Sequence, residues 1–261
     1  MRTSVYTLAV ALAATAAAPA LGQPIEQTKN TQTTIRGQSG TASSKSEEKT
    51  KEQIEADKLT TGRRLVISKE ARAAIIELQK AVDANDTATI PAKLAAAQKL
   101  AKTVDDKYVI AVNQTKAATA AGDLAGMRAG IDALRASGGA ENADLVARYN
   151  NLGKRHYDAK QTDLAAAAFE QALTVDGNNG DALKMLASLR DSQGRKAEAV
   201  ALMAKSIAAA KAAGQKPKEA EYKFAARIAY DAKAPAAGQI TQAWLADYPT
   251  PTNWRDALRI Y

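Results

Sequence analysis

Cysteine is absent from the 261-residue chain, histidine occurs once, as His156, and aromatic residues are limited to 2 Phe, 2 Trp and 8 Tyr. The lack of cysteine excludes a disulfide scaffold, an iron–sulfur protein and a thiol enzyme. The single histidine also excludes a zinc site built from several Cys or His ligands. We therefore expect no metal site and no cofactor.

Alanine, by contrast, makes up 61 of the 261 residues. Beta-branched and aromatic residues, which favour strands, are scarce, whereas Ala, Leu, Lys, Gln and Glu, which favour helices, are plentiful. The composition predicts an all-α protein whose thin helices pack closely together.

The first 22 residues have the features of a secretory signal peptide. Arg2 supplies a positive start, and the 16 residues from Val5 to Ala20 carry no charge. Small residues at Ala18, Ala20 and Gly22 suit a signal peptidase. The run is shorter than the ~20 residues that span a bilayer, so we expect cleavage and export, with the periplasm as the destination. An uncleaved signal anchor tethered to the inner membrane is the alternative. We expect no stable membrane span after signal cleavage.

Residues 23–61 form a polar segment in which only Ile25, Ile35, Ile54 and Leu59 are large and apolar. So little apolar surface does not offset the entropy of ordering the backbone, so we expect a disordered linker. Residues 23–60 are electrically neutral, which places +7 of the net charge of +8 on the chain from residue 61 onward. Its cations are interspersed with carboxylates, which favours an ordinary solvated surface, and no nucleic acid partner is expected.

From residue 69 onward, apolar residues recur at helical spacing in segments of 12–15 residues. Short turns separate these segments, at Asp86, Gly122-Asp123, Gly138-Gly139, Gly177-Asn178-Asn179, Gly194 and Gly214.

Residues 146–179 and 180–213 align as two consecutive copies of a 34-residue repeat. Positions 4, 7, 8, 20, 24 and 27 hold Tyr149, Leu152, Gly153, Ala165, Phe169 and Ala172 in the first copy, and Leu183, Leu186, Ala187, Ala199, Met203 and Ser206 in the second. Small residues at positions 8, 20 and 27 let two helices approach, and large residues at positions 4, 7 and 24 fill the space between repeats. This pattern resembles the tetratricopeptide repeat (TPR), a pair of antiparallel helices stacked on its neighbours.

Weaker copies occupy residues 71–104, 108–141 and 218–251. Trp254, Ala257, Leu258 and Tyr261 then match the start of one more first helix. Without its partner, such a helix would leave an apolar face uncovered. We therefore expect the repeat domain to be incomplete at the C-terminus, as in a fragment of a longer protein.

The resemblance implies a tetratricopeptide-like helix-hairpin solenoid, a right-handed superhelix, over residues 62–261. An irregular helical bundle is the alternative. The whole chain resembles an exported, alanine-rich TPR protein of the Gram-negative type, a group mostly without assigned activity.

Motifs of catalysis are absent: the sequence has no GxxxxGK[ST] phosphate loop and no GxGxxG turn. His156 falls at position 11 of the first aligned repeat, where a packed imidazole is favoured over a catalytic base. Carboxylates such as Asp105, Asp106 and Asp163 are expected to cap helices. We predict that the protein is not an enzyme and has no catalytic residue.

A binding surface is the favoured alternative. The resemblance implies that positions 2, 5, 9 and 12 of the first helices line a concave wall and contact a peptide. In the two aligned repeats these are Ala147, Asn150, Lys154, Tyr157, Asp181, Lys184, Ser188 and Asp191. Asn150, Lys154 and Lys184 would hold a peptide carboxylate or backbone. That these are ordinary exposed polar residues is the alternative.

The sequence thus favours a non-catalytic scaffold or adaptor of the cell envelope that binds a protein or peptide partner. One alternative is an accessory helical domain of a longer envelope enzyme, or of a secretion component, whose active region lies beyond residue 261. Binding of an anionic polymer by the basic body is a third possibility, and predicts an affinity that falls steeply with salt.

Overall fold

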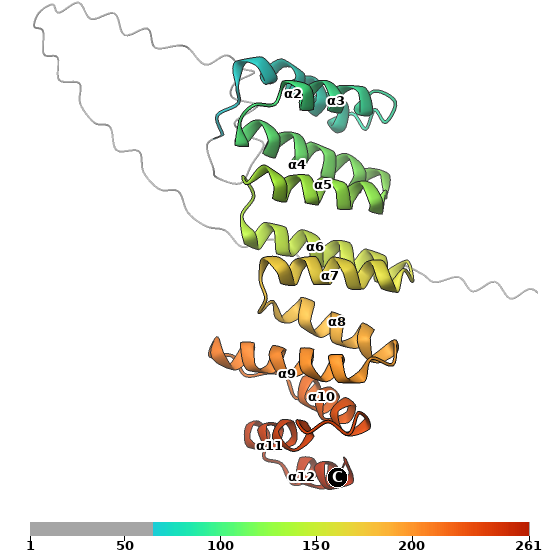
Figure 1. Cartoon of the computed structure of the whole chain (residues 1–261), viewed down its shortest axis with the longest axis vertical. Helices are drawn as coiled ribbons and strands as arrows, with labels where there is room; N and C mark the ends of the chain where they lie inside the picture. Colours follow the sequence, from blue (N-terminus) through green and yellow to red (C-terminus); the bar gives the residue numbers. More distant parts are fainter. Residues whose placement is uncertain (1–64, 261) are drawn as a thin grey trace, which may run out of the picture. The chain divides into compact units, whose positions relative to one another are not determined.

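Helix hairpins make up the part of the chain that the computed structural model describes, residues 65–260 (Figure 1). Within this range there are eleven α-helices and no strand. Five hairpins follow one another and a last helix follows them: α2 (Lys69–Asp83) with α3 (Ile90–Leu100), α4 (Val104–Ala121) with α5 (Leu124–Ser137), α6 (Asn142–Asp158) with α7 (Thr162–Val175), α8 (Gly180–Ser192) with α9 (Lys196–Ala212), α10 (Glu219–Asp231) with α11 (Ala237–Asp247), and α12 (Pro251–Ile260). The predicted all-α, tetratricopeptide-like array of hairpins is confirmed.

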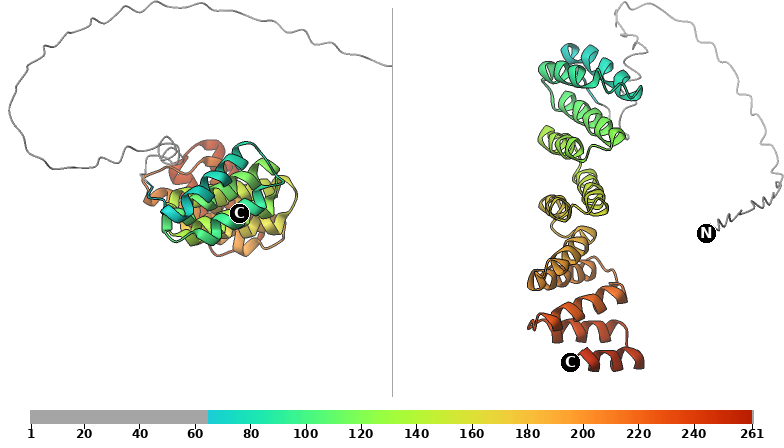
Figure 2. Two further views of the ribbon diagram at one scale, coloured as in Figure 1. Left: turned by 90° about the horizontal axis from the view of Figure 1, so that it is seen from above. Right: turned by 90° about the vertical axis from the view of Figure 1, so that its right-hand side faces the viewer.

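Each hairpin also packs against the next one in chain order (Figures 1 and 2). Helix α7 contacts α8, and α9 contacts α10, so hairpins that are consecutive in the sequence are also neighbours in space. All six turns predicted from Gly, Asn and Asp residues fall between helices. The turn at Gly122 illustrates the cause, because its φ of 67° lies in the left-handed region that glycine adopts without strain.

The two helices of the α6–α7 hairpin approach closely because position 8 of the repeat is a glycine. A Cβ atom on Gly153 would lie 2.7 Å from Cζ of Phe169, which is far inside van der Waals contact. Phe169 is fully buried in the same core cluster as Tyr149 and Leu152. The small and large positions inferred from the repeat therefore meet in space as the packing argument requires.

A buried carboxylate fastens the beginning of the described chain to α4. Asp106 is completely buried and accepts hydrogen bonds from the N–H groups of Ser68 (2.8 Å), Lys102 (3.0 Å) and Thr103 (3.0 Å). Burial alone would raise the pKa of Asp106, but these N–H groups hold the pKa below its ordinary value. The extended residues that precede α2 are thereby pinned, with Leu65 and Ile67 buried.

Helix α12 packs one face against α10 and α11 and leaves the other open. Ala257 is buried, whereas Trp254 is 55% and Leu258 75% exposed.

The predicted signal peptide (1–22) and polar linker (23–61) lie outside the described residues, as does Tyr261. Within residues 65–260, no helix has both the length and the apolar character needed to cross a membrane.

Candidate functional site

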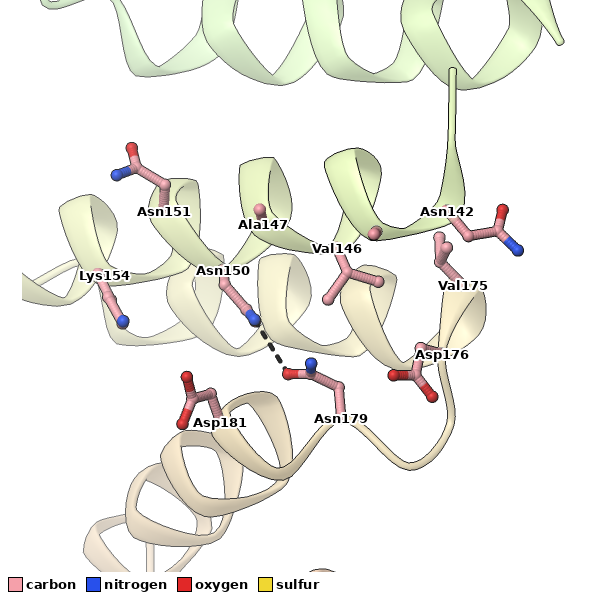
Figure 3. Close-up of a pocket in the computed structure, with 11 residues that line it drawn as sticks. Asn142, Val146, Ala147, Asn150, Asn151, Lys154, Val175, Asp176, Asn179 and Asp181 are labelled. Carbon is pink, nitrogen blue, oxygen red and sulfur yellow. Dashed lines mark hydrogen bonds between the residues drawn. The ribbon is translucent and has the colours of Figure 1, made fainter. Parts of the chain in front are cut away.

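A cavity of about 710 Å³ opens between α6, the first residues of α8 and the loop that joins α7 to α8 (Figure 3). We call it the α6–α8 cavity. It brings together four of the residues that sequence analysis selected, Ala147, Asn150, Lys154 and Asp181. The other lining residues are Asn142, Ala143, Val146, Asn151, Val175, Asp176 and Asn179.

Two asparagines fix the geometry at the centre of this cavity. The side-chain oxygen of Asn179 accepts the N–H of Ala182 at 3.0 Å and so caps the N-terminus of α8. The same oxygen accepts the side-chain amide of Asn150 at 3.0 Å, the dashed line in Figure 3. Because the cap requires the Asn179 oxygen at this point, Asn150 must turn its NH₂ group toward it. The helix cap therefore determines the orientation of both amides.

Asn150 is left with one unused hydrogen-bonding atom. The residue is only 8% exposed, and its Oδ1 atom has no hydrogen-bond partner among residues 65–260. A buried acceptor without a partner costs free energy on the order of 1–3 kcal/mol. A hydrogen bond from a ligand, or a small shift of the Asn150 side chain toward a donor, would remove this cost.

The wall of the cavity combines an apolar part with charges of both signs. Val146 is buried and Val175 half-buried, and they form the apolar part. Lys154 is exposed and projects from α6, on the opposite side of Asn150 from Asp176 (Figure 3). Asp176 accepts the N–H of Asn178 at 3.0 Å. The cavity thus offers amides, a cation and a carboxylate around an apolar surface.

Lys184 has a different environment from the one expected for a carboxylate-binding residue. Its ammonium nitrogen lies 3.0 Å from Glu221 and 3.5 Å from Asp181. Burial lowers the pKa of Lys184, but the hydrogen bond and charge of Glu221, with those of Asp181, raise it overall. The positive charge of Lys184 is therefore already balanced within the chain.

The remaining predicted residues do not line the α6–α8 cavity. Tyr157 is 47% exposed at the end of α6, and Ser188 is exposed on α8. Asp191 forms an ion pair with Arg227 at 2.8 Å, which joins α8 to α10. Asn179 was missed, although its position just before a helix is the sequence signal of an N-cap.

His156 belongs to the packing of the α6–α7 turn. It is 6% exposed, and its Nδ1 atom lies 2.7 Å from Oε1 of Gln161. Among residues 65–260, no group of three or more His, Cys, Asp or Glu side chains is arranged to hold a metal ion.

No family model and no curated protein matches this chain. Among solved structures, it is similar to PilW, described as a widely conserved type IV pilus biogenesis factor, with 14% identity over 73% of this chain and 83% of that one and a TM-score of 0.39. It is similar to YrrB, described as a TPR protein with an unusual peptide-binding site, with 15% identity over 71% and 90% of the two chains and a TM-score of 0.38. For PilF of Pseudomonas aeruginosa the identity is 14% over 74% and 98%, with a TM-score of 0.35. The fold assignment rests on the hairpins of this chain itself.

Proposed function

We propose that this protein is a non-catalytic interaction scaffold that binds an extended peptide segment of a partner protein in the α6–α8 cavity. The observation that carries the proposal is the convergence of Ala147, Asn150, Lys154 and Asp181 on one cavity of about 710 Å³. Helical spacing places Ala147, Asn150 and Lys154 on one face of α6, and the packing of the next hairpin adds Asp181 to the same cavity.

The chemistry of the cavity suits a peptide backbone. A peptide presents alternating N–H and C=O groups, and asparagine side chains supply both an acceptor and donors. Four asparagines line the cavity. Asn142 and Asn151 are exposed, whereas Asn150 is buried and Asn179 half-buried. A small apolar side chain of the ligand would pack on Val146 and Val175. Lys154 would pair with a carboxylate of the ligand.

We place the scaffold in the cell envelope, after export to the periplasm. The support for this placement is the pattern of residues 1–22, a positive start followed by 16 uncharged residues and small residues at the cleavage site. The alternative of an accessory domain in a longer envelope enzyme or secretion component has no residue of the described chain in its favour.

A peptide selection followed by a blocking substitution tests the proposal. Random linear peptides displayed on phage are selected on the full chain, and the affinity of an enriched peptide is measured by calorimetry. In the variant Ala147→Trp, an indole on the exposed face of α6 fills the cavity without entering the core. We expect the peptide to bind at least about tenfold more weakly, a loss of ~1.4 kcal/mol.

Ala201→Trp is the matched control, because Ala201 is an exposed alanine of α9 that does not line the cavity. A surface substitution of this kind changes free energies by less than about 0.5 kcal/mol, so its affinity should stay near that of the parent chain. Equal affinity in the Ala147→Trp variant, or a selection that enriches no peptide, contradicts the proposal.

A further inference from the structure

A second cavity, of about 360 Å³, lies on the other side of the N-terminus of α8. We call it the α8–α9 cavity. It is bounded by the first turn of α8, the last two turns of α9 and the loop that leads to α10. It shares only Asp176 and Asn179 with the α6–α8 cavity. Its serine and its lysines are not used in the function proposed above.

Ser206 points its hydroxyl group toward the start of α8 across this cavity. The residue is 5% exposed, and no hydrogen bond of its side chain is found within residues 65–260. Its Oγ atom lies 3.9 Å from the place that a Cβ on Gly180, the first residue of α8, would occupy. Ala172 stands at the same repeat position in the preceding hairpin, so packing alone does not require a hydroxyl here.

The N-terminus of α8 contributes backbone donors to the same space. Asn179 caps the N–H of Ala182, whereas helix geometry leaves the N–H groups of Gly180 and Asp181 without an intrahelical acceptor. The aligned peptide dipoles of this 13-residue helix also place partial positive charge at its N-terminus. A hydroxyl, free N–H groups and a helix N-terminus together favour a bound oxyanion.

Charged side chains complete the wall of the cavity, with lysines in excess. Lys184, Lys216 and Lys218 line it, against the carboxylates of Asp176 and Glu221. Both carboxylates are already engaged. The N–H of Asn178 donates to Asp176, while the ammonium of Lys184 (3.0 Å) and the N–H of Lys218 (3.3 Å) donate to Glu221.

The ammonium group of Lys216 lies 4.0 Å from the centre of the Tyr248 ring, a cation–π contact, and no carboxylate of residues 65–260 forms an ion pair with it. The bond from Lys218 to Glu221 uses only its backbone N–H, so the ammonium groups of both Lys216 and Lys218 remain for a ligand.

We propose that the α8–α9 cavity is a binding site for an anionic oxygen group, a carboxylate or a phosphate. The hydroxyl of Ser206 and the N–H group of Gly180 donate hydrogen bonds to its oxygens, and Lys216 supplies the counter-charge. The sequence suggested that Lys184 holds a carboxylate on the concave wall of the repeats. The proposal moves anion binding to this neighbouring cavity.

A titration monitored by NMR tests this site directly on the full chain labelled with ¹⁵N. Sodium phosphate, sodium acetate and sodium chloride are added separately at matched ionic strength, and the backbone amide signals of Gly180 and Asp181 are followed. We expect saturable shifts with phosphate or acetate that chloride does not produce. Tighter binding of phosphate assigns the site to a phosphate group, and equal or tighter binding of acetate assigns it to a carboxylate.

Two variants keep the test specific. Ser206→Ala restores the residue type of the preceding repeat, so the fold is retained, and the anion should bind at least about fivefold more weakly, the scale of one hydrogen bond. Lys216→Gln should weaken it by a similar factor, whereas Lys154→Gln, which alters only the α6–α8 cavity, should leave it unchanged. Shifts that chloride reproduces, or that persist unchanged in Ser206→Ala, overturn the proposal. Neither result depends on whether the α6–α8 cavity binds a peptide.

Discussion

Replacement of Gly153 by alanine should destabilise the protein, although the same change stabilises most helices. In a helix interior alanine is favoured over glycine by about 0.8–1.0 kcal/mol. Here the added Cβ would lie 2.7 Å from Cζ and 2.8 Å from Cε1 of Phe169, a ring that is fully buried. Overpacking of a core in this way costs roughly 1–3 kcal/mol. The two effects together predict a net loss on the order of 1 kcal/mol.

The next hairpin supplies the design of a rescue. Ala187 and Met203 occupy the positions that correspond to Gly153 and Phe169, and both are buried. The double variant Gly153→Ala/Phe169→Met therefore recreates a pair that the chain already packs. The loss of unfolding free energy in the double variant should be smaller than the sum of the losses in the two single variants. The expected difference is about 1 kcal/mol, the coupling typical of residues in contact.

Urea denaturation monitored by circular dichroism measures all of these variants. Gly180→Ala is the matched control, because the nearest atom to its added Cβ is Oγ of Ser206 at 3.9 Å, an ordinary contact. We expect this control to retain or gain stability. A Gly153→Ala variant as stable as the parent, or a double variant with purely additive effects, would refute the packing argument for the repeat.

Three further predictions concern other parts of the array. Asp106→Asn should cost about 3 kcal/mol in urea denaturation, since at least one of the three N–H groups then faces an NH₂ donor. The pKa of Asp106 is lowered from 3.8. The stability it contributes is present above about pH 4 and is lost as pH falls through the folded-state pKa, so the two denaturation curves should converge in acid. His156→Ala should lower the midpoint of thermal unfolding, through a loss of about 2 kcal/mol, and leave peptide affinity unchanged in calorimetry. Arg227→Gln removes exposed ion pairs with Asp191 and Asp231, so its cost in urea should stay below about 1 kcal/mol and shrink in 1 M salt.

The hairpins could be predicted from the sequence because turn chemistry and helical periodicity are local. Gly122 and Gly194 mark turns whose left-handed φ a glycine adopts freely, and both fall where helices end. The limits of a helix are harder to predict than its existence. Helix α6 begins at residue 142, four residues before the aligned repeat at 146, because Asn142 to Leu145 extend the same helix without a break.

The candidate site was predictable only in part, because ion pairing between hairpins is not local. Asn150 and Lys154 share one face of α6 and line the same cavity, since their repeat positions fix the direction of their side chains. The ion pair of Lys184 with Glu221 joins residues 37 positions apart, so it cannot be predicted from the spacing within one repeat. Ser206 was noticed only as a small residue, because the cavity that it faces is formed by the loop after its own helix.

The absence of cysteine offers the most direct test of the central claim, that a partner peptide occupies the α6–α8 cavity. A single cysteine introduced as Ala147→Cys carries a small trifluoromethyl label at a unique site, and a selected peptide carries a nitroxide. On addition of the peptide, the ¹⁹F signal of the label at residue 147 should broaden, and that of a label introduced as Ala201→Cys should not. Broadening at residue 201 alone, or at neither position while the peptide is bound, would contradict the account.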